Sequence, residues 1–228
     1  MKALTYHGPR DVRFETAPDP TRLGPRDAIV HVELAGLCGS DLHVYRGTEV
    51  GLDVGTVMGH EFVGRVVEVG DAVSDLALGT RVVSPFSTCC GRCYYCVRGL
   101  SARCVEGHLY GWVQNGAGLH GAQAERVRVP LADTTLVPVP DDLPDDVALL
   151  LGDVLATGYY CALQAGSLPT LTPVVIGCGP VGLAAVLAAR ELGARRVLAV
   201  DTVPSASRTR AGSAPRRSTR RTSRGATR

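Results

Sequence analysis

Four closely spaced cysteines constrain the fold of this chain more than any other feature: Cys90, Cys93, Cys96 and Cys104. Two C-x2-C steps overlap, and the fourth thiol follows eight residues later. Because such spacing lets one loop close a tetrahedral, all-thiolate shell, we predict a structural zinc site. A disulfide pair or a redox C-x2-C motif is the alternative interpretation. Cys89, directly before the set, is expected to take no part.

A second candidate metal site centres on Gly59-His60-Glu61. An imidazole and a carboxylate stand there at the entrance of an apolar strand, residues 62–69, and glycine lets the backbone turn sharply. Cys38 offers a thiolate upstream, and Asp153 offers a carboxylate downstream. Three potential ligands therefore come from distant parts of the chain. The alternatives are a small buried residue for Cys38 and a helix cap for Asp153.

The first 140 residues show short alternating or β-branched runs separated by turn residues, a pattern typical of antiparallel strands. We expect strands at residues 2–7, 12–15, 28–34, 62–69, 81–84 and 124–129, forming a small, partly closed barrel. From Asp145 the pattern changes to acids followed by helically spaced apolar residues.

A βαβ unit is predicted next, with buried parallel strands at residues 173–176 and 196–201 around a helix at 183–192. A glycine-rich turn joins the first strand to the helix, and an acid ends the second strand. The helix N-terminus can receive a pyrophosphate, and the acid can accept hydrogen bonds from a ribose, which favours NAD over NADP. An ordinary βαβ turn is the alternative. The cofactor-binding residues predicted here are Gly177, Gly179, Pro180, Val181, Gly182 and Asp201.

The charge of the chain is unevenly distributed. Residues 202–228 contain eight arginines and no acid, so residues 1–201 carry a net charge of −6 although the whole chain carries +2. The body therefore has no basic excess for nucleic acid, and the Arg/Ser/Thr-rich tail is expected to be disordered. Nucleic-acid binding through the tail is a minor alternative. No apolar run reaches membrane-spanning length and no signal peptide opens the chain, so we expect a cytoplasmic protein without a membrane partner.

With these motifs, residues 1–201 of the chain resemble the zinc-dependent alcohol dehydrogenases of the medium-chain dehydrogenase/reductase superfamily. With Asp153 at the third ligand position, the chain is most similar to the branch of formaldehyde, threonine and polyol dehydrogenases. The resemblance implies a GroES-like, partly open β-barrel followed by an incomplete Rossmann βαβ unit, which is part of an NAD-binding domain. We expect domains at residues 1–145 and 146–201, and the tail at 202–228.

The resemblance also implies site residues and cofactors. A catalytic zinc would be held by Cys38, His60 and Asp153, with Glu61 as an occasional ligand, and the Cys90 set would hold a second, structural zinc. Ser40 and His43 would relay the alcohol proton, although His43 also suits an ordinary surface position. Hydride would pass between a primary or secondary alcohol, or an aldehyde or ketone, and NAD.

After Asp201 the composition departs from the family, which suggests a truncated homologue or a frameshifted reading. We therefore expect an impaired or inactive enzyme, lacking the strands through which relatives form homo-oligomers. A non-catalytic zinc-binding fragment is the alternative. The identity of the alcohol does not follow from the sequence.

Overall fold

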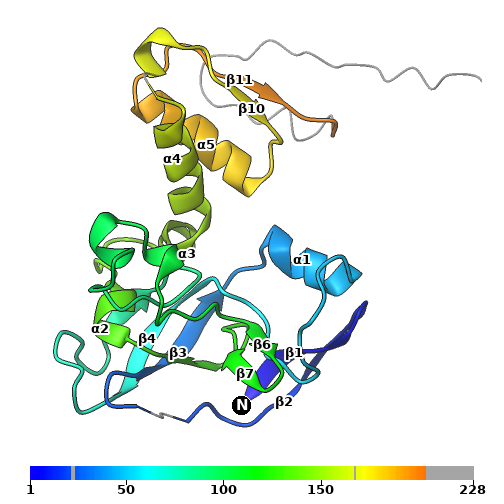
Figure 1. Ribbon diagram of the computed structural model, residues 1–228, viewed down its shortest axis with the longest axis vertical. Coiled ribbons are helices and arrows are strands. Elements are labelled where there is room, and N and C mark those ends of the chain that lie inside the picture. The colour runs from blue at the N-terminus through cyan, green and yellow to red at the C-terminus, as the bar shows by residue number, and fades with distance from the viewer. Residues whose placement is uncertain (22–23, 167, 204–228) are drawn as a thin grey trace, which may run out of the picture. The chain divides into compact units, whose positions relative to one another are not determined.

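A computed structural model describes residues 1–21, 24–166 and 168–203 (Figure 1). Contacts within the chain divide it into two compact units, Met1–Asp153 and Val154–Arg228. The mixed fold class predicted from the sequence, β-rich first and βαβ afterwards, is confirmed. The predicted disordered tail lies outside the described residues, apart from its first two positions.

The first unit is built around a five-stranded antiparallel sheet with the order β8-β3-β4-β5-β9. Its strands are β3 (Ala28–Ala35), β4 (Phe62–Val69), β5 (Arg81–Val83), β8 (Arg126–Val129) and β9 (Val137–Pro138). The β-branched residues that predicted these strands supply much of the core, including Val30, Val66 and Val127. Burying each such side chain stabilises the fold by about 1.5–3 kcal/mol.

Two hairpins complete the β structure of this unit. They are formed by β1 (Lys2–Gly8) with β2 (Asp11–Thr16), and by β6 (Trp112–Gln114) with β7 (Ala117–Leu119). Isolated bridges from Ala3 to Ala124 and from Thr5 to Val57 tie β1 to the rest of the unit, as a partly closed barrel requires. The short β6–β7 hairpin was not predicted, because its strands have three residues each and little apolar alternation.

The helices of the first unit are short: α1 (Gly39–Arg46), η1 (Cys96–Arg98), η2 (Ser101–Arg103), α2 (Ala132–Thr135) and α3 (Asp145–Gly152). α3 begins where the acids of its first turn predicted, and it packs on β3, β4 and β5. Tyr110 and Phe62 meet edge to face in the core, with ring centroids 5.4 Å apart. Tyr110 therefore packs in the core of the first unit.

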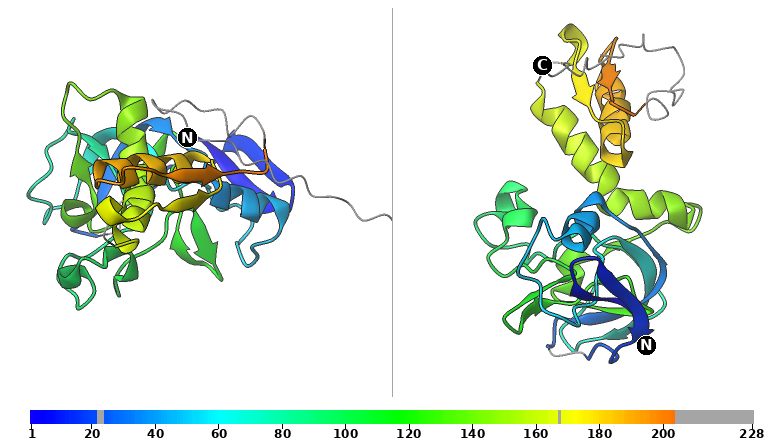
Figure 2. Two further views of the ribbon diagram at one scale, coloured as in Figure 1. Left: turned by 90° about the horizontal axis from the view of Figure 1, so that it is seen from above. Right: turned by 90° about the vertical axis from the view of Figure 1, so that its right-hand side faces the viewer.

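The described part of the second unit contains α4 (Val154–Gln164), η3 (Leu168–Thr170), β10 (Val174–Ile176), α5 (Pro180–Glu191) and β11 (Leu198–Val200). β10 and β11 pair in parallel, and α5 connects them and packs on β10 (Figure 2). The predicted βαβ unit is thus present. α4, which packs on α5, was not predicted, because its glycine and aromatic residues weaken the helical pattern.

One sequence expectation about this unit is wrong in detail. The apolar run at β10 suggested a buried strand, yet Val174 is 55% and Ile176 87% exposed. Only Val175, between them, faces the cluster formed with α5, because nothing among the described residues covers the opposite face.

Among the described residues, no single helix is long and apolar enough to cross a membrane. α3 and α4 taken together would pass that test by length and composition alone.

Candidate metal and cofactor sites

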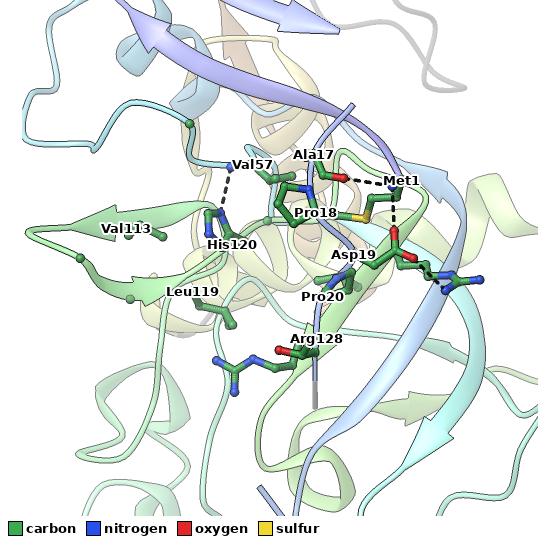
Figure 3. Close-up of a pocket in the computed structure, with 17 residues that line it drawn as sticks. Met1, Ala17, Pro18, Asp19, Pro20, Val57, Val113, Leu119, His120 and Arg128 are labelled. Atoms are coloured by element: carbon green, nitrogen blue, oxygen red, sulfur yellow. Dashed lines mark hydrogen bonds and ion pairs between the residues drawn. The ribbon is translucent and has the colours of Figure 1, made fainter. Parts of the chain in front are cut away.

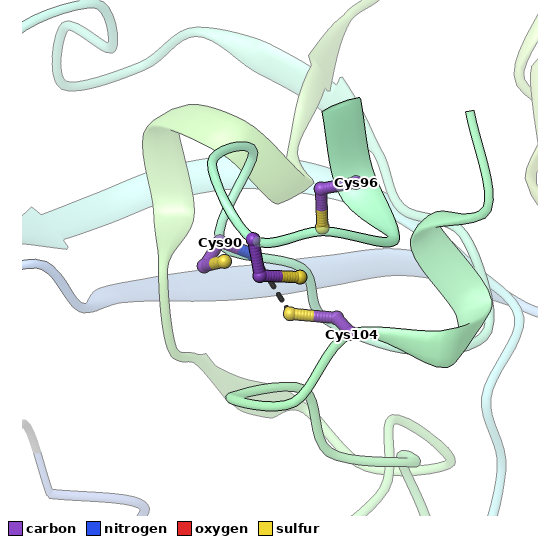
Figure 4. A group of neighbouring side chains, drawn as sticks. Cys90, Cys96 and Cys104 are labelled. Atoms are coloured by element: carbon purple, nitrogen blue, oxygen red, sulfur yellow. Dashed lines mark hydrogen bonds between the residues drawn. The ribbon is translucent and has the colours of Figure 1, made fainter. Parts of the chain in front are cut away.

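The four cysteines of the predicted structural site meet in space. Cys90, Cys93, Cys96 and Cys104 offer sulfur atoms that all lie within 4.8 Å of one another. Figure 4 shows the sulfurs of the three labelled cysteines directed toward a common centre. Two 3₁₀ helices, η1 and η2, turn the loop back on itself so that the fourth cysteine reaches the first three. This donor set suits a tetrahedral zinc ion.

Backbone groups prepare this loop for an ion. The backbone N–H of Cys90 donates to Sγ of Cys104 at 3.2 Å. Hydrogen bonds from the N–H groups of Cys96 and Val105 lower the pKa of Cys93 to about 6, which favours the thiolate that a metal requires. Cys89 lies outside the four-cysteine set: its thiol donates to the carbonyl of Thr134 at 3.0 Å.

The second predicted set also comes together. Cys38, His60, Glu61 and Asp153 each offer a ligand atom, and these atoms lie within 4.8 Å of one another. Nε2 of His60 is 3.4 Å from Oδ2 of Asp153, and Sγ of Cys38 is 3.9 Å from the same oxygen. All four belong to the first unit. His60 and Glu61 are buried, and the other two are half-buried.

Three separate elements bring these side chains to one point. Cys38 is the N-cap of α1, where its backbone N–H donates to Oδ2 of Asp41 at 2.9 Å. His60 and Glu61 lie immediately before β4. Asp153 follows α3, whose last residue, Gly152, touches the backbone after β5 so closely that a Cβ there would lie 2.4 Å from the carbonyl of Ser84.

The pKa values in the cluster of Cys38, His60, Glu61 and Asp153 are shifted because these ionisable side chains lie close together. Burial lowers the pKa of His60, but hydrogen bonds to Asp153 and Cys38 and the charge of Asp41 outweigh it and raise the pKa to about 10. A hydrogen bond with His60 lowers the pKa of Cys38 against the opposing effect of burial. Without a metal, a proton on His60 therefore provides the positive charge that balances the anionic groups.

The cluster fits a divalent cation because one of its carboxylates, that of Glu61, has an unsatisfied oxygen. Burial, followed by the charge of Asp153, raises the pKa of Glu61, and burial raises that of Asp41. Oε1 of Glu61 is buried and has no hydrogen-bond partner among the described residues. A buried carboxylate oxygen without a donor is costly, and a cation in the cluster would remove that cost.

The predicted relay residues lie on α1, but at different distances from the cluster. After the hydrogen bond with His60, the hydroxyl and the backbone N–H of Ser40 also lower the pKa of Cys38. His43 is exposed, and its Nδ1 lies 3.5 Å from Oγ1 of Thr48. The structure thus places Ser40 next to the predicted ligand Cys38, whereas His43 contacts the turn that follows α1.

In the second unit, the glycine-rich turn leads directly into α5. Gly177 has a φ of +97°, Gly179 is the N-cap, and Pro180 and Val181 open the helix. Gly182 packs so closely that a Cβ would lie 1.9 Å from the carbonyl of Gly177. Asp201 directly follows β11 and lies beside this turn, where its Oδ2 accepts a hydrogen bond from the N–H of Cys178 at 2.7 Å. That bond lowers the pKa of Asp201 and keeps it anionic.

Residues 24–141 match the family described as "Alcohol dehydrogenase GroES-like domain". The chain belongs to the zinc-type alcohol dehydrogenase family. Relatives include the "Medium chain reductase/dehydrogenase ucsI" of Acremonium sp., 47% identical over 90% of this chain and 71% of that protein. The "Zinc-type alcohol dehydrogenase B" of Aspergillus flavus is 44% identical, over 90% of this chain and 48% of that protein.

The solved "Alcohol dehydrogenase TADH from Thermus sp. ATN1" has a similar fold, with a TM-score of 0.86 and 41% sequence identity. The match covers 91% of this chain and 60% of that structure. Apart from the Acremonium relative, the chain spans about half the length of the curated relatives compared with it. The chain thus belongs to a family of zinc-type alcohol dehydrogenase-like oxidoreductases, and its first unit is GroES-like as predicted.

A separate cavity of about 350 Å³ in this GroES-like unit takes no part in either cluster (Figure 3). Its charged groups are already paired: the N-terminal amine donates to Asp19 at 2.7 Å, and Arg126 donates to the other oxygen of Asp19 at 3.2 Å. Arg128 is bound to Asp27 at 2.9 Å. We therefore assign no chemistry to this cavity.

Sequence reasoning missed two residues around the second cluster. Oδ1 of Asp41 lies 3.7 Å from Nδ1 of His60, on the opposite side of the ring from Asp153. Gln123 donates to Asp41 from between β7 and β8. The spacing of Asp41 after Cys38 could have suggested a capping residue, whereas no local pattern marks Gln123.

Proposed function

We propose that this protein is a zinc-dependent oxidoreductase that transfers hydride between a primary or secondary alcohol, or the corresponding aldehyde or ketone, and NAD, with impaired turnover because the composition after Asp201 departs from that of the family. The observation that carries the proposal is the convergence of ligand atoms from Cys38, His60, Glu61 and Asp153. A buried oxygen of Glu61 that has no hydrogen-bond partner among the described residues adds to it. The named activity of the alcohol dehydrogenase relatives supports it.

In this proposal Cys38, His60 and Asp153 hold the catalytic zinc, and Glu61 is available as a further oxygen donor. A bound zinc ion supplies a Lewis acid that polarises an alcohol or carbonyl oxygen. The four cysteines hold a second zinc that stabilises the loop. NAD supplies the hydride acceptor, and its chemistry belongs to the cofactor.

The residues of the chain supply binding and proton transfer. Ser40, next to Cys38, has a hydroxyl that can take the alcohol proton, and His43 on the same helix can pass a proton to solvent. The N-terminus of α5 directs backbone N–H groups toward the position that a pyrophosphate would take. Each carboxylate oxygen of Asp201 accepts one hydrogen bond, from the N–H of Cys178 or of Val203. The remaining lone pairs would accept hydrogen bonds from the ribose hydroxyls of NAD, and the negative charge would disfavour the 2′-phosphate of NADP.

The test combines three measurements on the protein: zinc content, NAD affinity by calorimetry, and the change in NADH absorbance with a panel of alcohols and aldehydes. We expect two zinc ions per chain, one for each cluster. Alcohol-dependent NAD reduction should disappear when Asp153 or Cys38 is replaced. Turnover that survives both replacements would contradict the proposal.

The same measurements examine the alternative function. Exposure of the apolar residues of β10 makes a metal-binding chain without catalysis the second candidate. Full zinc occupancy without NAD binding or turnover would favour that candidate over the dehydrogenase.

A further inference from the structure

Gln123 is buried, and backbone hydrogen bonds to two other segments fix its main chain. It is 9% exposed and lies between β7 and β8. Its N–H donates to the carbonyl of Met58 at 2.8 Å, and its own carbonyl accepts from the N–H of Leu4 at 2.8 Å. The direction in which its side chain leaves the backbone is therefore set by the barrel.

The amide of Gln123 ends between two oxygen acceptors. Nε2 donates to the carbonyl of Gly36 at 3.0 Å and to Oδ2 of Asp41 at 3.1 Å. Because both partners are acceptors, the –NH₂ group must face them, and both of its hydrogens are used. One side chain thereby links the approach to Cys38 with the carboxylate beside His60.

Asp41 transmits this contact to His60. Oδ2 of Asp41 accepts from Gln123 and from the N–H of Cys38, so Oδ1 is the oxygen that faces Nδ1 of His60 at 3.7 Å. A histidine that binds a metal through Nε2 is commonly oriented by an acceptor at Nδ1. By binding Oδ2 of Asp41, Gln123 thus helps to leave Oδ1 as the oxygen that orients the ring of His60.

The backbone leaves room for this side chain directly beside the ligand. A Cβ on Gly59, the residue before His60, would lie 2.3 Å from Cγ of Gln123. The turn that delivers His60 is therefore compatible with Gln123 only because residue 59 has no side chain.

We propose that Gln123 is a positioning residue for a divalent cation held by Cys38, His60 and Asp153, acting through Asp41 and the carbonyl of Gly36. This inference rests on the proposed function, since it requires that the cluster bind a metal. It assigns Gln123 no contact with substrate or with the ion.

Two variants separate hydrogen bonding from packing. Gln123→Leu removes both donors, and Gln123→Glu keeps the shape but directs a carboxylate at Asp41 and at a carbonyl. Gln114→Leu, at the exposed end of β6, is the matched control. Zinc affinity is measured by chelator competition, and Co²⁺-substituted protein provides an absorption spectrum that reports the ligand geometry. The zinc held by the four cysteines serves as an internal measure of correct folding.

For both Gln123 variants, we expect zinc affinity at the Cys38 cluster to fall about 10-fold to 100-fold, the range for partners of metal-ligating histidines. The Co²⁺ bands should shift, and the four-cysteine site and the control should be unchanged. A wild-type protein with zinc only at the four cysteines would overturn the proposed function and this inference together. A second zinc bound equally well by wild type, Gln123→Leu and Gln123→Glu would overturn the inference alone.

Discussion

Sγ of Cys38 lies 3.9 Å from Oδ2 of Asp153, a residue 115 positions later in the chain. This distance places both atoms within reach of one ion, and His60 approaches the same oxygen. Bringing together residues so far apart in the chain costs conformational entropy. The packing of α3 on the sheet of the barrel offsets that cost, whether or not an ion is bound. The cluster is therefore preorganised by the first unit.

Replacing Asp153 tests that cluster directly. Asp153→Ala removes one ligand and leaves His60 and Cys38 without their common partner, so we expect zinc content to fall from two ions per chain to one. Elemental analysis after dialysis measures this change. Asp146→Ala, an exposed acid on α3, should retain both ions. Loss of both ions from Asp153→Ala would mean that the substitution unfolds the unit.

Replacing Cys104 tests the structural site. We expect Cys104→Ser to lose that zinc and its contribution to stability, because metal binding to such sites has an apparent free energy of about 10–16 kcal/mol. Thermal unfolding of Cys104→Ser should resemble that of wild-type protein treated with a chelator. Cys161→Ser, which changes an exposed thiol outside the clusters, should unfold like wild type. An unchanged midpoint in Cys104→Ser would argue against a structural ion.

Gly36 should tolerate no side chain, because a Cβ there would lie 2.1 Å from Oε2 of Glu61. We expect Gly36→Ala to destabilise the first unit by about 1–3 kcal/mol, the usual cost of overpacking, and to displace Glu61. Denaturant unfolding gives the free energy. Gly39→Ala is the control, since a Cβ at that position meets nothing within 4 Å. Equal stability of the two variants would show that Glu61 moves aside without cost.

His120 should make stability depend on pH. Burial, and then the charge of Arg128, lowers its pKa, and its Nδ1 accepts a hydrogen bond from the N–H of Val57 at 3.1 Å. The folded state therefore binds this proton less readily than the unfolded state. The contribution of His120 is complete above the unfolded pKa of about 6.5 and is lost as pH falls through that value.

We expect the free energy of unfolding to decrease less between pH 7.5 and pH 5.5 in His120→Asn than in wild type. Urea titrations of both proteins at the two pH values provide the comparison, in which contributions from other titrating groups cancel. His43→Asn, at an exposed histidine, should behave like wild type. A steeper pH dependence in His120→Asn would contradict the assignment.

Local patterns in the sequence determined much of this protein. The β-branched runs predicted β3 and β4, the acids after Pro144 predicted α3, and the glycine-rich turn predicted the start of α5. The spacing of Cys90, Cys93, Cys96 and Cys104 predicted their proximity, because a single loop brings them together. Such features depend on neighbours within about a dozen residues, and they can be read before the chain is folded.

The tertiary structure alone decided the relationships that cross the chain. The meeting of Cys38 with Asp153 was expected from family resemblance and not from any periodicity, and the contact of Gln123 with Asp41 was not foreseen at all. The exposure of Ile176 also contradicts its apolar pattern. The physical reason is the same in each case: side-chain contacts and burial depend on which distant segments pack together, and one segment's own residues do not specify its partners.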